Sequence, residues 1–340
     1  MVFFSISIFT YYAINSASYK SFIINTGILF VCALYFNYYV GFSRKRLVFS
    51  VMIFYLLLSL STIIMLLDHV YPARFDRVRE LMLGSPLLQG PTGVSVTIFN
   101  FGYQVAALVS FLVIFPLVYK KPFWMTVGLL FFSLLGIFFG MQRSVFVTFV
   151  FSAFAFSLFY YRFKSVFIMG LGLLLGFLIY SFVLKKESAQ YDNILVKEQN
   201  SEENRSGLMT ENLKIYMDYP YGLVFYGKNW YDVSKNNPVF SGGLTSHNAY
   251  FMFITYLGPF LGFGLLFLIY RPIVEIFKRS LRNIREEKYA LMVCLCFSFL
   301  GVSLNALFHN AWLLNGNGAA VFLYFAILQL NYINFQSKQV

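Results

Sequence analysis

Apolar runs of about twenty residues recur along most of this chain, and they constrain its fold more than any other feature. A helix of that length crosses the hydrocarbon core of a bilayer, where every backbone group must be paired within the protein. Hydrophobic residues make up 59% of the chain and charged residues 12%, which is far from the composition of a soluble domain. The sequence therefore predicts an all-α, polytopic helical membrane protein.

The runs predict ten transmembrane helices. The expected spans are residues 2–17, 21–41, 47–67, 94–118, 122–140, 144–161, 165–184, 247–270, 289–308 and 312–331. The first run is the weakest, because it is short and contains several polar side chains. Residues 1–184 would hold the first seven helices, residues 185–246 a larger periplasmic segment, and residues 247–340 the last three helices and a cytoplasmic tail.

The charged residues orient these helices. With ten spans, 14 Lys and Arg residues and three acidic residues fall on one side, against 12 and 11 on the other. Positive loops stay in the cytoplasm, so loop 271–288 is expected inside, and segments 68–93 and 185–246 outside. Asp68 and His69 are then expected to be solvated loop residues. The net charge of +12 is thus a topology signal and not a nucleic-acid-binding surface.

The second half of the outer segment contains signals for ordered structure. Residues 206–218 mix apolar and polar side chains, which favours a short helix near the membrane surface. The sequence DYPYG, from Asp218 to Gly222, favours a turn. Aromatic residues follow closely, and they form either an interfacial belt or a platform on which sugar rings stack. These residues are Tyr219, Tyr221, Phe225, Tyr226, Trp230 and Tyr231.

One histidine, His247, stands where the outer segment meets the next apolar run. An imidazole takes up and returns a proton near neutral pH, so His247 is the candidate catalytic base. The alternative is that His247 only caps or hydrogen-bonds the start of a helix. His309 is predicted at the same membrane face, at the outer end of the ninth helix, and is a candidate supporting residue.

Two arginines on that face are candidate ligands for an anion. Arg143 interrupts the apolar stretch 123–160 at the outer end of a helical hairpin, and the alternative is a simple turn residue. Arg205 opens the second half of the outer segment, and the alternative is a solvated loop charge. A guanidinium group suits a phosphate, because it donates two parallel hydrogen bonds. The sequence shows no cluster of metal-ligand spacing on this face, so we expect no metal and no cofactor.

Three motifs resemble those of the O-antigen ligase and polymerase superfamily of bacterial envelope proteins. The similar stretches are QRS at residues 142–144, RSG at residues 205–207 leading to DYPYG, and SHNAY at residues 246–250 followed by Gly258 and Gly262. The resemblance covers about residues 120–331, and the first 120 residues match only in being membrane helices.

The resemblance implies a helical glycosyltransferase of the C type that uses no metal. Its donor would be a glycan on undecaprenyl diphosphate at the periplasmic face of the bacterial inner membrane. Arg143 and Arg205 would bind the diphosphate. His247 would take the proton of the acceptor hydroxyl, with Asn248, Tyr250 and His309 in support, and in-line attack would invert the anomeric centre.

Two activities compete within that family. A polymerase joins repeat units of an O-antigen, capsule or related polysaccharide, and a ligase moves the finished glycan onto lipid A-core. The short chain, its many Phe and Tyr residues and its single modest outer segment favour the polymerase. A lipid-linked oligosaccharide flippase would show charges deep in several helices or repeated halves, which this sequence lacks. The expected partners are the lipid-linked oligosaccharide, membrane lipid, a chain-length regulator and a flippase, and no nucleic acid.

Overall fold

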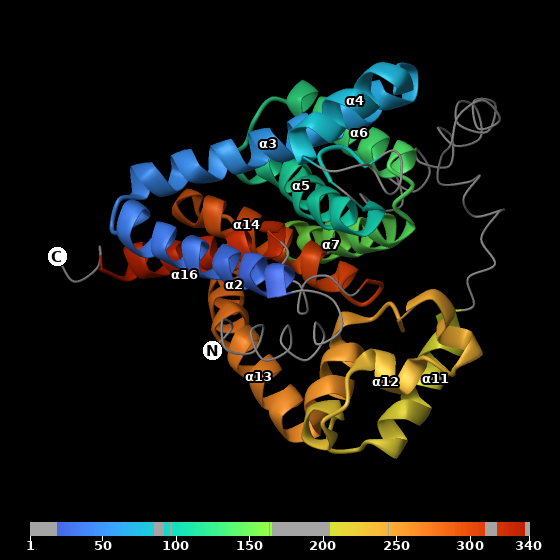
Figure 1. Cartoon of the computed structure of the whole chain (residues 1–340). Coiled ribbons are helices and arrows are strands. Elements are labelled where there is room, and N and C mark those ends of the chain that lie inside the picture. Colours follow the sequence, from blue (N-terminus) through green and yellow to red (C-terminus); the bar gives the residue numbers. More distant parts are fainter. Residues whose placement is uncertain are drawn as a thin grey trace. The chain divides into compact units, whose positions relative to one another are not determined.

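The computed structural model of the chain describes residues 19–84, 92–95, 97–162, 164, 205–243, 245–309 and 318–336. This described part is all-helical, with eleven α-helices and no strand (Figure 1). Five of these helices are long and apolar enough to cross a membrane. The chain divides into two compact units, which we describe separately. Unit 1 comprises Met1–Leu47, Glu202–Ile276 and Ala306–Val340, and unit 2 comprises Val48–Ser201 and Phe277–Asn305.

Unit 2 is a bundle built around α14 (Ala290–Asn305). Nearly every side chain of α14 is buried, and the helix lies against α5 and α7 (Figure 1). A helix that is apolar on all sides belongs inside a bundle. The surrounding long helices are α3 (Arg44–Val70), which begins in unit 1, α5 (Ile98–Val118), α6 (Phe123–Phe139) and α7 (Arg143–Tyr161).

A short chain of buried hydrogen bonds joins three helices of this bundle. The Tyr55 hydroxyl on α3 donates to Oγ of Ser298 on α14 at 2.7 Å, and Ser298 donates to the carbonyl of Ala107 on α5 at 2.6 Å. Such pairing is what a buried hydroxyl needs. The apolar core beside it comprises Met65, Phe101, Val105, Ala106, Val109, Ile137, Val145 and Phe149.

The helix ends of unit 2 meet in two separate groups. At one end, the ring nitrogen Nε2 of His69, near the end of α3, lies 2.8 Å from the carbonyl oxygen of Phe139 at the end of α6. At the other end, the Tyr160 hydroxyl donates to the Leu117 carbonyl, and Arg285 donates two hydrogen bonds to the Tyr160 carbonyl. The helix ends in the first group are those of α3 and α6, which the charge pattern predicts outside. The helix ends in the second group are those of α5 and α7, which it predicts inside. The grouping therefore agrees with the predicted alternation of these helices.

The described part of segment 68–93, residues 68–84 and 92–93, is not the solvated loop that we expected. α3 runs to Val70, and α4 (Pro72–Leu83) follows at once. Proline fits the first turn of a helix, because the N–H that it lacks would have no partner there. The structure thus places a helix where the charge pattern alone predicted only an outer connection.

A buried ion pair explains why Asp68 is not solvated. Arg79 of α4 has no exposed surface, and its Nη1 lies 2.6 Å from Oδ2 of Asp68. Arg79 also donates to the Gly93 carbonyl at 2.9 Å and to the Thr92 hydroxyl. Buried charges are tolerated when they are paired and their remaining donors are satisfied. The prediction of a solvated Asp68 is wrong, because its partner arrives from a helix that the sequence did not reveal.

In unit 1, the first and last described helices of the chain pack against each other. α2 (Tyr19–Leu34) continues into the π-helical turn η1 (Tyr35–Val40), and α16 (Gly318–Gln336) packs beside them. The rings of Phe36 and Phe322 lie 5.2 Å apart, and the Gln329 side chain donates to the Gly41 carbonyl at 2.6 Å. The rest of unit 1 consists of α11 (Arg205–Asp218), η3 (Leu223–Tyr226), α12 (Trp230–Ser234), η4 (Pro238–Gly243) and most of α13 (Ala249–Arg282).

α13 is made of two arms and is not one straight helix. Gly258 has φ +74° and ψ 175°, which are not helical, and Pro259 has no N–H with which to continue the hydrogen-bond ladder. The arms fold back on each other, since the hydroxyl groups of Tyr250 and Tyr270 lie 2.7 Å apart. In a straight helix these two residues would stand about 30 Å apart.

This reversal corrects the predicted eighth span, residues 247–270. The first arm, residues 249–257, is about 13 Å long at 1.5 Å per residue and is too short to cross a bilayer. The second arm, residues 259–282, is about 36 Å long and is sufficient alone. This arm extends through Arg282, so the first two-thirds of the expected loop 271–288 is helical.

The remaining expectations for the helices mostly agree with the structure. The predicted runs coincide within a few residues with α2 and η1, α3, α5, α6, α7, α14 and α16. The short helix expected at residues 206–218 is α11. The predicted spans 2–17 and 165–184 lie outside the described residues.

Candidate functional site

His247 precedes the first arm of α13, in unit 1, and has an unusual backbone. Its φ is +52°, in the left-handed region that costs a non-glycine residue about 1–2 kcal/mol. The residue is half-buried. A strained residue persists only where its surroundings fix it, and such residues cluster at functional sites. The contacts on either side of His247 therefore define this site.

On the C-terminal side, Asn248 fixes the chain. Its side-chain oxygen accepts a hydrogen bond from the N–H of Phe251 at 3.0 Å, which caps the helix start. The N–H of Ala249 donates to the Ala306 carbonyl at 2.8 Å and ties the first arm to the turn after α14. Asn248 thus supplies the side-chain cap that was the alternative role of His247.

On the N-terminal side, Asn212 of α11 fixes the chain through Ser246. The Asn212 side chain is fully buried. Its NH2 group donates to Ser246 Oγ at 2.9 Å and to the sulfur of Met252 at 3.3 Å, and its oxygen accepts from the Thr255 hydroxyl at 3.1 Å. Buried amides require such partners. Sequence reasoning missed Asn212, because one asparagine in an amphipathic helix does not reveal which segment it will face.

A second contact holds α11 to the segment that follows it. The Glu211 carboxylate pairs with Lys214 and accepts a hydrogen bond from the Asn237 side chain at 3.2 Å. The hydrogen bonds from Lys214 and Asn237 hold the pKa of Glu211 below its usual range. Glu211 is therefore ionised at neutral pH and keeps both partners.

Trp230 is a core residue and belongs to neither of the expected aromatic surfaces. It is buried, with its ring 5.0 Å from that of Phe240 and 6.2 Å from that of Tyr256 on the first arm of α13. Large aromatic side chains gain most from such burial. Trp230 therefore packs α12 and η4 against the arm that follows His247.

The DYPYG turn docks on the break in α13. A Cβ on Gly222 would lie 2.2 Å from the nitrogen of Gly258, and a Cβ on Gly258 would lie 1.9 Å from the Tyr221 carbonyl oxygen. Both glycines also have positive φ, so only glycine fits at either position. The turn predicted from the sequence is present, and it is fixed to the tip between the two arms.

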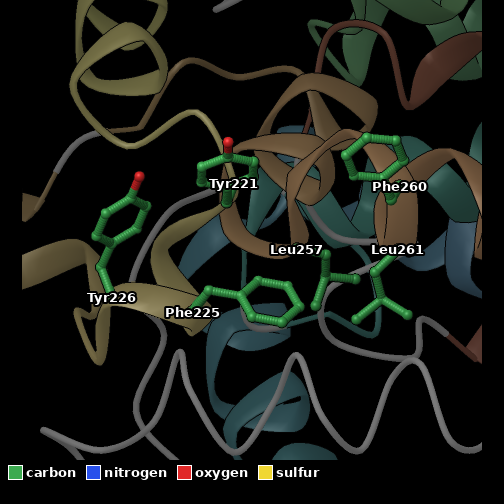
Figure 2. Close-up of a pocket in the computed structure, with 6 residues that line it drawn as sticks. All are labelled: Tyr221, Phe225, Tyr226, Leu257, Phe260 and Leu261. Atoms are coloured by element: carbon green, nitrogen blue, oxygen red, sulfur yellow. The ribbon is translucent and has the colours of Figure 1, made fainter.

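An open groove lies beside this contact, with a volume of about 860 Å³. Figure 2 shows the Phe225 ring next to the side chains of Leu257 and Leu261. Aromatic and aliphatic walls suit a hydrocarbon chain or the apolar face of a sugar ring, so either interpretation of these aromatic residues is consistent with the groove. The lining residues are Tyr221, Phe225, Tyr226, Leu257, Phe260 and Leu261.

The other predicted site residues take separate places. Tyr250 braces the two arms of α13 through its contact with Tyr270, and His309 is buried just after the turn that follows α14. The backbone of Arg205 begins α11, while its side chain lies outside what the structure describes. Arg143 begins α7 in unit 2 and is half-buried there. The structure therefore gathers the histidine motif in unit 1 and leaves Arg143 in the other unit.

Among the described residues, no group of three or more His, Cys, Asp and Glu side chains has the arrangement of a metal site. No protein-family model matches the chain, and no curated protein matches it.

Proposed function

We propose that this protein is a polysaccharide polymerase of the O-antigen or capsular type. It joins repeat units carried on undecaprenyl diphosphate at the outer face of the bacterial inner membrane, and its architecture is that of a ten-span glycosyltransferase of the C type. The observation that carries the proposal is the backbone of His247, which is left-handed and fixed on both sides. A catalytic base has to be held in a defined position, and local strain at functional residues reflects that requirement.

In the proposed reaction, the neutral imidazole of His247 removes the proton from a hydroxyl group of the acceptor sugar. That oxygen attacks the anomeric carbon of the donor sugar while the bond from this carbon to the diphosphate oxygen breaks. Undecaprenyl diphosphate leaves with the bonding electron pair, and attack from the opposite face inverts the anomeric centre. The proton then passes from His247 to solvent, which restores the base.

Arg143 and Arg205 are the proposed ligands of the diphosphate. Negative charge grows on the leaving group as the bond breaks, and fixed cationic donors stabilise that charge in the transition state. A guanidinium group stays charged at any working pH and donates a pair of parallel hydrogen bonds to phosphate oxygens. The proposal thus separates two roles, with binding at the arginines and proton transfer at His247.

A ligase and a flippase are the two alternative functions. A ligase would perform the same chemistry with lipid A-core as the acceptor, and the modest outer segment favours the polymerase. A flippase would move the intact donor without breaking a bond. Charges in transport pathways lie deep within helices, whereas Arg143 and Asp68 lie at helix ends.

Purified protein in liposomes, supplied with labelled undecaprenyl-diphosphate-linked repeat units, tests the proposal. We expect longer lipid-linked glycans and free undecaprenyl diphosphate when no lipid A-core is present. Transfer that requires added lipid A-core would identify a ligase, and movement of an unchanged donor across the bilayer would identify a flippase. A parent protein that converts no lipid-linked glycan would contradict the proposed function.

A further inference from the structure

One buried hydrogen bond joins α11 to the residue that precedes His247. Asn212 is fully buried and Ser246 is 3% exposed, and their side chains meet at 2.9 Å across 34 residues of sequence. Moving Ser246 away would leave a buried donor of the Asn212 amide unpaired, which costs about 1–3 kcal/mol. The hydrogen bond therefore fixes the peptide that leads into His247.

The conformation of that peptide determines where the imidazole points. The φ torsion of His247 is +52°, and without support it would return to the negative range that non-glycine residues prefer. Asn248 holds the chain beyond His247, so the bond from Asn212 supplies the restraint on the near side. A change of φ at this position would rotate the whole side chain away from its present direction.

The NH2 group and the oxygen of the Asn212 amide have different partners, so their effects on His247 can be tested separately. The NH2 group reaches Ser246, next to His247, whereas the oxygen accepts from Thr255, about two helical turns further along the first arm. The Thr255 contact holds α11 against the arm but does not involve the neighbours of His247. Loss of either contact costs stability, but the Ser246 contact is the one that adjoins His247.

We propose that Asn212 is a positioning residue that acts on His247 through Ser246. The catalytic consequence rests on the proposed function, whereas the effect on the conformation of His247 does not. α11 begins at Arg205, about two turns before Asn212, so Asn212 links this outer helix to the residue that precedes His247. The histidine and the outer helix are thereby coupled through one amide.

Isotope-labelled histidine allows a direct test, because the chain has three histidines, of which His69 lies in unit 2. The imidazole signals of the parent are compared with those of Asn212→Leu, Ser246→Ala and Thr255→Val, after His247→Gln has identified the relevant signal. We expect the His247 signal to move in the first two variants and to stay in place in Thr255→Val. The signal of His69 serves as an internal reference.

Turnover provides the second measurement. Asn212→Leu and Ser246→Ala are each expected to lose about 10–100-fold in kcat with donor binding unchanged, and the double variant should lose no more than the single ones. Thr255→Val should lower the Tm yet retain turnover. Ser246→Ala removes only one hydroxyl group and keeps the test valid if Asn212→Leu does not fold.

The outcomes separate the two proposals. An unchanged His247 signal in both Asn212→Leu and Ser246→Ala, or an equal displacement in Thr255→Val, would overturn the positioning role. A parent protein without any glycosyl transfer would overturn the proposed function, while the His247 signals would still decide whether Asn212 positions the histidine.

Discussion

Buried polar residues in the described part serve two purposes at the scale of single side chains. Arg79 and Asp68 form a buried structural pair, and the guanidinium group also donates to the Gly93 carbonyl and the Thr92 hydroxyl. Asn212 and Ser246, by contrast, are paired next to a strained residue, His247. The first arrangement stabilises the fold of unit 2, and the second, as we propose, holds the side chain of His247 in place.

Arg79→Met should destabilise the protein by about 3–5 kcal/mol, because it leaves Asp68 buried without its counter-charge. Arg77→Met on the same helix is the matched control, since Arg77 is exposed and its loss should change the stability by about 0.5 kcal/mol or less. Chemical unfolding in detergent measures both. Equal stabilities of the two variants would show that the Arg79–Asp68 ion pair does not stabilise the fold.

Arg143→Ala and Arg205→Ala should each abolish chain extension while the protein still inserts, because the diphosphate loses a charged partner. Arg→Lys at either position should retain little activity, since an ammonium group cannot make the paired contact. Polymer length and the amount of protein in the membrane are measured together, with exposed Arg74→Ala as the control. Polymer of normal length in both Ala variants would remove the assigned role.

At the scale of helices, the break at Gly258 organises unit 1. It reverses α13, it receives the DYPYG turn at the tip, and it forms one side of the aromatic groove. The first arm can then carry an apolar face into the unit, with Met252, Phe253 and Tyr256 buried. His247 thus lies at the start of a short arm that packs within unit 1, while the second arm is long enough to span the membrane.

Gly258→Ala should disrupt the docking of the turn. The backbone at φ +74° and ψ 175° alone costs alanine about 1–3 kcal/mol, and the added Cβ would collide with the Tyr221 carbonyl. Gly264→Ala on the second arm is the control, because no atom lies within 4 Å of the added carbon. We expect a lower Tm and faster proteolysis of residues 205–243 in Gly258→Ala only. The same behaviour in both variants would contradict the docking.

The sequence predicted those features that hydrophobic length and charge determine locally. Seven runs and the short outer helix at Arg205–Asp218 correspond to helices because each carries its own apolar pattern. The reversal of α13 was missed although Gly258-Pro259 is a known break signal, because the apolar run continues unchanged across it. The partners of Asp68 and Asn212 were missed because they depend on which distant segments pack together, and no local pattern encodes that choice.

For the whole molecule, the distribution of charge predicts an orientation in the membrane. Within unit 2, the end of α5, the end of α7 and Arg285 meet at one place, and the ends of α3 and α6 meet at another. Positive segments stay inside, so the His247 site and α11 are predicted at the outer face.

Single cysteines at Lys228 and Lys278, both exposed positions, test that orientation in a background where Cys32 is replaced by serine. A membrane-impermeant maleimide should label position 228 in intact spheroplasts and position 278 only after permeabilisation. The background protein without an added cysteine measures unspecific labelling. Equal labelling of both positions in intact spheroplasts would contradict the topology.

The central claim is that His247 is the base of a glycosyl transfer, and the rate of His247→Ala on lipid-linked repeat units tests it most directly. We expect the rate of His247→Ala to fall by about 10²–10⁴-fold with donor binding retained. The rate of His309→Ala should fall much less. The parent should also slow as the medium becomes acidic, because a protonated imidazole cannot accept a proton. Polymerisation by His247→Ala at the parent rate would contradict the account.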